Sequence, residues 1–229
     1  MSEEQVRPDF DRRVATALRG AGASGTGVSL FIVALVLLAP PIAAVAVFVW
    51  LWLSRTELKL VGLVRPDNWA WVLVLGVAAG VVSKLLLKAV VMPYLGAPPT
   101  NAMLAPLAGN LQATLVEIAE VIVLAGFAEE IVFRGFLFHR LQVLYGSSVG
   151  ARIFMVLGGG LFFGSLHWFG QGYFGAVNAT IMGVIFGTLY FLNGQRLWFL
   201  IIMHAGFDAF AVWLTYAGLE EQVARSVFG

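Results

Sequence analysis

Long apolar stretches, separated by short polar breaks, run along most of this chain. The first, from Val28 to Leu53, carries Ala39-Pro40-Pro41 at its centre, and a proline inside a helix removes a hydrogen bond and bends the axis. This stretch is therefore either one kinked span or a re-entrant hairpin of two half-helices. The next apolar stretch runs from Trp69 to about Val91 and predicts a further membrane helix.

The second half of the chain predicts a bundle of antiparallel helices joined by short turns. An apolar helix over residues 111–128 is followed by helices over 129–145, 151–168, 174–192 and 197–216. In such an arrangement the start of one helix and the end of the next lie at the same depth. Glu129, His167 and Asp208 would then share one layer, with His204 one turn deeper. The pattern thus predicts a polar site inside the membrane, built from residues far apart in sequence.

The composition is typical of a membrane protein. Of the 229 residues, 60% are hydrophobic and 12% are charged, whereas soluble domains are about 45–50% apolar. We therefore predict an all-α, polytopic helical protein of the cell inner membrane or plasma membrane, with roughly six to eight membrane helices and a four-helix catalytic core. The chain has no cysteine, which excludes disulfides, a thiol nucleophile and thiolate metal sites. Its net charge of +1 gives no basic surface for nucleic acid.

Charge and hydropathy divide the chain into four regions. We expect a cytoplasmic N-terminal tail over 1–27 without a cleaved leader, N-terminal membrane helices and loops over 28–107, a catalytic membrane core over 108–217, and a C-terminal tail over 218–229. Basic residues occur both in the tail and in the loop 54–68. Since basic segments stay on the cytoplasmic side, both can be cytoplasmic only if residues 28–53 re-enter the membrane instead of crossing it.

Candidate chemistry is concentrated in the segment FAEEIVFRG, residues 127–135. An ionisable residue at mid-membrane costs about 2.5–3.5 kcal/mol to insert, so several together indicate a function or mutual pairing. Glu130 and Arg134 are four positions apart on one helix face and predict an ion pair. Glu129, five positions from Arg134, is left free to act as a general base.

Two more pairs at the same spacing add to this layer. His204 and Asp208 share a face of the last helix. Phe163 and His167 share a face of an earlier helix, where the Phe163 ring is able to wall the site. One membrane histidine alone usually hydrogen-bonds a neighbouring helix, but two at the depth of Glu129 indicate a site.

Other polar residues have plainer interpretations. His139 lies on another level of its helix and is expected to be structural. Lys84 and Lys88 are expected to extend to the membrane interface. Glu117 and Glu120 have no visible partner in the sequence pattern, and their role is left open.

Three motifs in this order resemble those of the CPBP family, the CAAX-protease and bacteriocin-processing membrane proteins, also called Abi. The segment EEIVFRG, which begins at Glu129, matches the EExxxR motif, and FGSLH, which ends at His167, matches FxxxH. The third motif is matched by HAGFD, from His204 to Asp208, with aspartate where many members have asparagine. The resemblance covers residues 108–217.

The resemblance implies a glutamate-dependent intramembrane endopeptidase that needs no cofactor. Glu129 with His167 would activate a water for attack on the scissile carbonyl. His204 and Asp208 would support the oxyanion that develops. Asp208 would do so when protonated, or indirectly by orienting His204.

The resemblance also implies supporting residues and partners. Glu130 and Arg134 would brace the catalytic helix, beside the wall formed by Phe163. The partners would be a membrane-associated peptide or protein substrate and the lipid bilayer, with no nucleic acid; the oligomeric state is left open. Eukaryotic members of the family remove the last three residues of prenylated CAAX proteins. Bacterial members are associated with peptide maturation, peptide export and bacteriocin self-immunity.

Three other interpretations use the same residues. Two histidines and two carboxylates could hold a catalytic zinc or a non-haem iron, although an HExxH helix is missing and the set comes from three helices. A non-catalytic immunity or scaffold protein could use the fold without cleavage, although all the catalytic positions are filled. A transporter or proton channel could relay protons through these groups, but the sequence has no clear inverted repeat.

Overall fold

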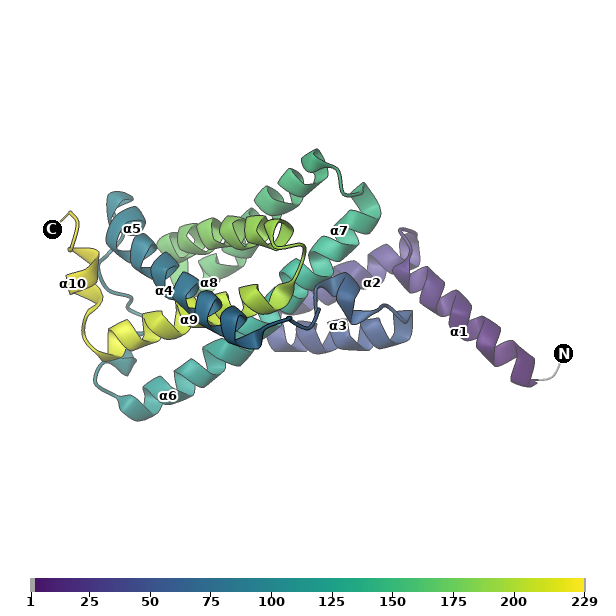
Figure 1. Cartoon of the computed structure of the whole chain (residues 1–229), viewed down its shortest axis with the longest axis horizontal. Helices are drawn as coiled ribbons and strands as arrows, with labels where there is room; N and C mark the ends of the chain where they lie inside the picture. The colour runs from purple at the N-terminus through teal and green to yellow at the C-terminus, as the bar shows by residue number, and fades with distance from the viewer. Residues whose placement is uncertain (1–2, 229) are drawn as a thin grey trace.

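The fold is an elongated assembly of helices, with the two termini at opposite ends of its long axis (Figure 1). The computed structural model describes residues 3–228, with side chains from Asp11 onward, and this part of the chain has no β-strand. Its α-helices are α1 (Glu3–Arg19), α2 (Ala23–Ala34), α3 (Pro40–Ser54), α4 (Trp69–Leu86), α5 (Met92–Tyr94), α6 (Leu111–Glu120), α7 (Phe138–Tyr145), α8 (Val149–Leu192), α9 (Leu197–Tyr216) and α10 (Glu220–Ala224). The π-helical segments are η3 (Leu87–Val91), η5 (Val121–Glu129) and η6 (Ile131–Leu137). Short 3-10 turns are η1 (Leu35–Leu37), η2 (Leu58–Val61) and η4 (Ala105–Leu107).

By length and composition, three helices of the described chain can cross a membrane: Trp69–Tyr94, Val149–Leu192 and Leu197–Tyr216. A fourth is added if the bent pair Asp11–Arg19 and Ala23–Leu37 is one span. Large apolar side chains face outward, as on α4, where Trp71 is 62% and Val74 is 60% exposed. Such a surface suits lipid tails better than water. The predicted all-α, polytopic membrane fold is confirmed, and the number of six to eight membrane helices stays a prediction.

The first apolar stretch folds as two half-helices that return to the same end. Between α2 and α3, Ala39 is extended (φ −169°, ψ 135°), and α3 begins with two prolines. At the far end of α3, the Trp50 indole donates to the Leu18 carbonyl (3.4 Å), and Arg55 pairs with Asp11 (3.6 Å). Both partners belong to α1. Residues 28–53 therefore form a helical hairpin whose two ends lie together, the shape that the re-entrant alternative requires. That the N-terminal tail and the 54–68 loop share the cytoplasmic side stays a prediction.

Residues 111–145 form one continuous helical stretch, composed of α6, η5, η6 and α7. The prediction of a separate helix that begins at Glu129 is wrong, because no glycine, proline or turn residue interrupts the backbone between Phe127 and Ile131. Instead, the π-helical segments η5 and η6 lie on either side of Glu130. π-helical turns are rare and occur frequently at functional sites.

α8 bends back on itself at Gly172, whose φ of 67° and ψ of −165° are not helical. The predicted break between residues 168 and 174 is confirmed and is confined to this one position. The two halves of α8 pack closely, since a Cβ on Gly160 would lie 2.7 Å from the Val184 side chain, and Gly164 lies against Thr180. His167 therefore lies near the end of the first half.

α9 packs against both α4 and η5 and is the most buried of the three candidate spans. Glycine residues at the contacts allow α9 to pack closely on α4 and on η5. A Cβ on Gly80 of α4 would lie 2.7 Å from the Phe207 nitrogen, and one on Gly126 of η5 would lie 2.8 Å from the Ala205 Cβ. The helices that carry the candidate residues are thus held at distances that only glycine allows.

Candidate active site

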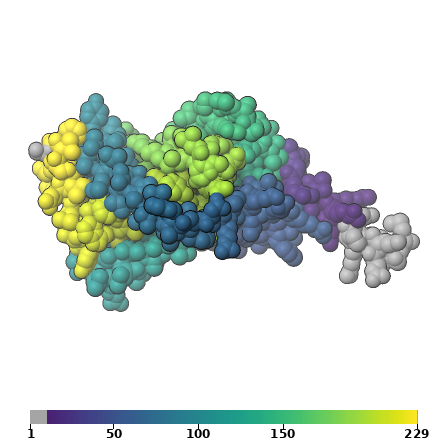
Figure 2. Space-filling view, viewed as in Figure 1, coloured from purple at the N-terminus to yellow at the C-terminus, as the bar shows by residue number. Residues whose placement is uncertain are grey.

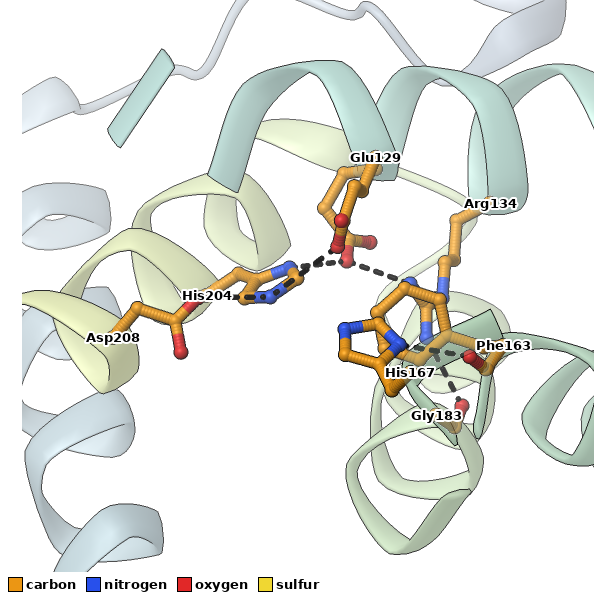
Figure 3. Close-up of polar contacts among 8 residues, drawn as sticks. Glu129, Arg134, Phe163, His167, Gly183, His204 and Asp208 are labelled. Carbon is orange, nitrogen blue, oxygen red and sulfur yellow. Dashed lines mark hydrogen bonds and ion pairs between the residues drawn. The ribbon is translucent and has the colours of Figure 1, made fainter. Parts of the chain in front are cut away.

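His204 of α9 lies at the centre of the polar residues that the sequence singles out (Figure 3). Its ring is buried, with 6% of the side chain exposed. Nδ1 donates to Oε1 of Glu130 over 2.9 Å. Nε2 lies 3.3 Å from Oδ2 of Asp208 and 3.8 Å from Oε2 of Glu129. Both ring nitrogens therefore face carboxylate oxygens, and three carboxylates from two helices converge on one imidazole.

Glu130 forms the ion pair with Arg134 that the four-residue spacing predicts. Nη1 of Arg134 donates to Oε1 of Glu130 over 2.8 Å, and both side chains are buried. Nη2 also donates to the carbonyl of Gly183 in the second half of α8 (3.3 Å). The guanidinium lies over the rings of Phe163 (4.8 Å) and Phe186 (5.2 Å). This pair joins the Glu130 helix to both halves of α8 and, through Glu130, to α9.

Glu129 is placed differently from its neighbour. It lines the central cavity, whereas Glu130 does not. Its Oε2 is buried and has no hydrogen-bond partner, and Nε2 of the His204 ring lies 3.8 Å from it. Oε2 of Glu130 is also without a partner, but Oε1 of Glu130 already accepts from both Arg134 and His204. A carboxylate that lines a cavity and has an oxygen without a donor is available to bind a water or a substrate group.

His167 belongs to the first half of α8, and its Nδ1 lies 2.9 Å from the Phe163 carbonyl. Because a carbonyl only accepts, Nδ1 carries the proton, which leaves the Nε2 lone pair of the neutral ring free. The Phe163 ring lies 4.5 Å from the His167 ring and 6.1 Å from the His204 ring, centroid to centroid. The Phe163 ring thus contacts both histidine rings and lines the cavity.

A cavity of about 670 Å³ connects these groups. Among the predicted residues, Glu129, Phe163, His167, His204 and Asp208 line it. A smaller groove of about 190 Å³ reaches Glu129 from the side of Pro40, and Glu117 and Glu120 line this groove. Glu117 lines both spaces. The two glutamates without an assigned role therefore lie along a second approach to Glu129.

Sequence reasoning missed two cavity residues, Lys84 and Lys88. The prediction that they extend to the membrane interface is wrong, because both line the cavity. The ammonium of Lys84 lies 4.0 Å from the centre of the Phe207 ring, and that of Lys88 lies 2.8 Å from Glu220.

The spacing of residues in the sequence could have predicted the inward direction of these lysines. Small or basic residues recur every four positions along this helix, at Gly76, Gly80, Lys84 and Lys88. Since Gly76 and Gly80 pack on α9, the lysines on the same face point inward.

The donor set does not fit a metal centre in this arrangement. The described residues hold no group of three or more histidine, aspartate or glutamate side chains that could bind a metal ion. His204 directs its nitrogens at Glu130 and Asp208, and His167 directs Nδ1 at a backbone carbonyl. That the reaction needs no cofactor stays a prediction.

Comparison with known families finds one match. Residues 111–210 match the model described as Rce1-like, type II CAAX prenyl endopeptidase Rce1-like. Neither the curated proteins nor the solved structures contain a match to this chain. The matched segment begins with α6 and includes all the residues of the predicted site: Glu129, Glu130, Arg134, Phe163, His167, His204 and Asp208. Such a family supports a membrane peptidase of the CAAX-protease type. Residues 111–210 are thus similar to the Rce1-like family, which confirms the resemblance to the CPBP family that the three motifs indicate.

Proposed function

We propose that this protein is an intramembrane endopeptidase of a cell inner membrane or plasma membrane, in which Glu129 activates the attacking water. Its substrates are peptides or proteins associated with the membrane. One observation carries the proposal: Glu129 lines the same cavity as His204 and His167, and its Oε2 has no hydrogen-bond partner and lies 3.8 Å from Nε2 of His204. The adjacent Glu130 is occupied by two hydrogen bonds and is not available for chemistry.

In the first step, Glu129 and His167 hold a water between them. As the water oxygen attacks the scissile carbonyl carbon, its proton passes to the Glu129 carboxylate. The lone pair on Nε2 of His167 accepts a hydrogen bond from the water and orients it, because Nδ1 is fixed by the Phe163 carbonyl. When the carbon–nitrogen bond breaks, Glu129 returns the proton to the leaving amine. The second proton of the water stays on the new carboxyl group, so the products are a carboxylic acid and an amine, and proton exchange between them gives a carboxylate and an ammonium group.

His204 stabilises the oxyanion that forms on the scissile carbonyl oxygen. A ring that donates from Nδ1 to Glu130 can donate from Nε2 only in its imidazolium form, and both His204 and Asp208, which lies beside Nε2, line the cavity. Asp208, 3.3 Å from Nε2, then acts by holding the ring and balancing its charge. Preorganised donors of this kind are typically worth about 10²–10³ in rate. Aspartate in place of the more common asparagine suits this orienting role.

Mapping of new peptide termini tests the proposal. Membranes from cells with matched levels of wild-type protein, Glu129→Gln and Glu120→Gln would be compared by mass spectrometry. Glu120 is the matched control because it lies on the same helical stretch and lines only the outer groove. We expect termini that depend on Glu129 and persist in Glu120→Gln. Identical termini in wild type and a folded Glu129→Gln variant would reject the proposal.

A further inference from the structure

Lys84 is a cavity cation without a carboxylate partner. Two basic residues line the cavity, Lys84 and Lys88. Lys88 is paired with Glu220 at 2.8 Å, which neutralises it. Lys84 makes no ion pair within 4.0 Å with any carboxylate among residues 11–228, and its ammonium lies over the face of the Phe207 ring. The face of the Phe207 ring thus holds the ammonium. Its carboxylate neighbours Asp208 and Glu220 act on its charge, but neither forms a direct ion pair with it.

Lys84 and Glu129 stand on opposite sides of the residues that would bind the reacting carbonyl. Gly80, one turn before Lys84, packs on the Phe207 side of α9, and Gly126, close to Glu129, packs on Ala205. At about 100° per residue, positions 205 and 207 project about 160° apart around α9. His204 and Asp208 project between these two directions. A peptide that lies across His204 would therefore have Glu129 at one flank and Lys84 at the other.

A positive charge inside a membrane protein is costly unless it meets an anion or serves a ligand. The geometry points to Lys84 as the residue that receives a carboxylate of the substrate and so fixes which peptide bond lies at Glu129. This inference rests on the proposed endopeptidase function and narrows its substrate class to peptides that carry a carboxylate on one side of the scissile bond. The carboxylate has two possible sources, the C-terminus of the peptide or an Asp or Glu side chain.

The test uses two libraries of N-palmitoylated octapeptides with randomised sequence, one ending in a carboxylate and one in a carboxamide. Purified full-length protein in detergent micelles would cleave each, with products identified by mass spectrometry. The variants are Lys84→Met, which removes the charge, and Lys84→Arg, which keeps it. Lys59→Met serves as the control because Lys59 is an exposed lysine far from the cavity lining.

If the C-terminus is the ligand, wild type cleaves the carboxylate library about tenfold faster or more, the typical value of a charge-assisted hydrogen bond. If a side chain is the ligand, wild type instead enriches Asp or Glu at one position of the carboxamide library. In either case Lys84→Met loses the preference, whereas Lys84→Arg and Lys59→Met keep it. The carboxylate preference compares cleavage of two kinds of peptide by the same variant, so it does not depend on how much of that variant is folded.

Two results would overturn the inference. One is a wild-type protein that cleaves both libraries with no carboxylate preference of either kind. The other is a Lys84→Met variant that is slower on both libraries and retains the preference, which would mean that Lys84 acts only through its neighbour Asp208. Cleavage of neither library by wild type would count against the endopeptidase proposal itself.

Discussion

Glu130 and His204 are joined by a hydrogen bond of 2.9 Å across 74 positions of sequence. The same oxygen of Glu130 accepts from Arg134, so one buried carboxylate holds the orientation of both a guanidinium and an imidazole. Glu130 therefore stabilises contacts between helices as well as the ion pair within its own helix. It connects η6 to α9 and sets the direction in which Nε2 of His204 points.

Glu130→Gln should destabilise the protein, because it leaves Arg134 charged and without a carboxylate in a buried site. Removal of one partner of a buried ion pair typically costs about 3–5 kcal/mol. Glu129→Gln removes no hydrogen bond and should stay near wild type in stability while losing about 10²–10⁴ in turnover. Thermal unfolding in detergent and turnover at matched protein amounts measure the two effects. Equal stability of both variants would contradict the different roles assigned to the two glutamates.

The sequence predicts what lies within one helix better than what lies between helices. The Glu130–Arg134 pair follows from four-residue spacing, and the break in α8 follows from its glycines. The Glu130–His204 bond does not follow, because it depends on how the helices are rotated against each other. That rotation is set by close contacts such as Gly126 on Ala205. The common depth of the polar residues is predictable from helix lengths, but their partners are not.

Two errors have separate physical causes. The helix boundary expected at Glu129 is absent, because a cluster of mutually paired charges lets the helix continue. The π-helical segments around it have no sequence signature. The inward direction of Lys84 was predictable, because Gly76 and Gly80 mark the packed face of α4.

Gly126→Ala should lower both the turnover and the stability of the protein. A Cβ at this position would lie 2.8 Å from the Ala205 Cβ and 3.0 Å from the Ala205 nitrogen, so η5 must move away from α9. Overpacking typically costs about 1–3 kcal/mol, and a displacement near 1 Å can cost about 100-fold in rate. Gly158→Ala is the matched control, since a Cβ there meets nothing within 4 Å. Normal turnover in Gly126→Ala would show that the close packing of η5 on α9 does not determine the positions of the active-site residues.

Lys88 and Glu220 should contribute to stability as a coupled pair. Their side chains are 16% and 11% exposed, and Glu220 also accepts from the Asn101 backbone (3.3 Å), so the pair ties α10 and the 97–104 loop to η3. These segments lie together at one end of the molecule (Figure 2). Lys88→Met should cost about 1–3 kcal/mol, between the values for exposed and fully buried pairs.

A double-mutant cycle separates the pair from its surroundings. Lys88→Met combined with Glu220→Leu should cost less than the sum of the single variants, because no charge is then left unpaired. Lys59→Met is the control for an exposed pair, since Lys59 and Glu57 are 64% and 66% exposed. Strictly additive effects at Lys88 and Glu220 would argue against coupling. Unfolding in detergent, followed by circular dichroism, provides the free energies.

Arg140 should hold the N-terminal helix against the membrane core. Its guanidinium donates to the carbonyls of Arg19 (2.6 Å) and Gly20 (2.7 Å), just after the last turn of α1, and to the Ser29 hydroxyl (2.8 Å). Hydrogen bonds from a charged donor are worth about 1.5–3 kcal/mol each, so Arg140→Leu should release this segment and speed tryptic cleavage after the exposed Arg19 about tenfold or more. Arg196→Leu, which removes an exposed arginine with a 3.4 Å contact to Asp67, should leave the cleavage rate unchanged. An unchanged rate in Arg140→Leu would mean that the other contacts of α1, which include the Trp50–Leu18 hydrogen bond and the Arg55–Asp11 ion pair, hold this segment without Arg140.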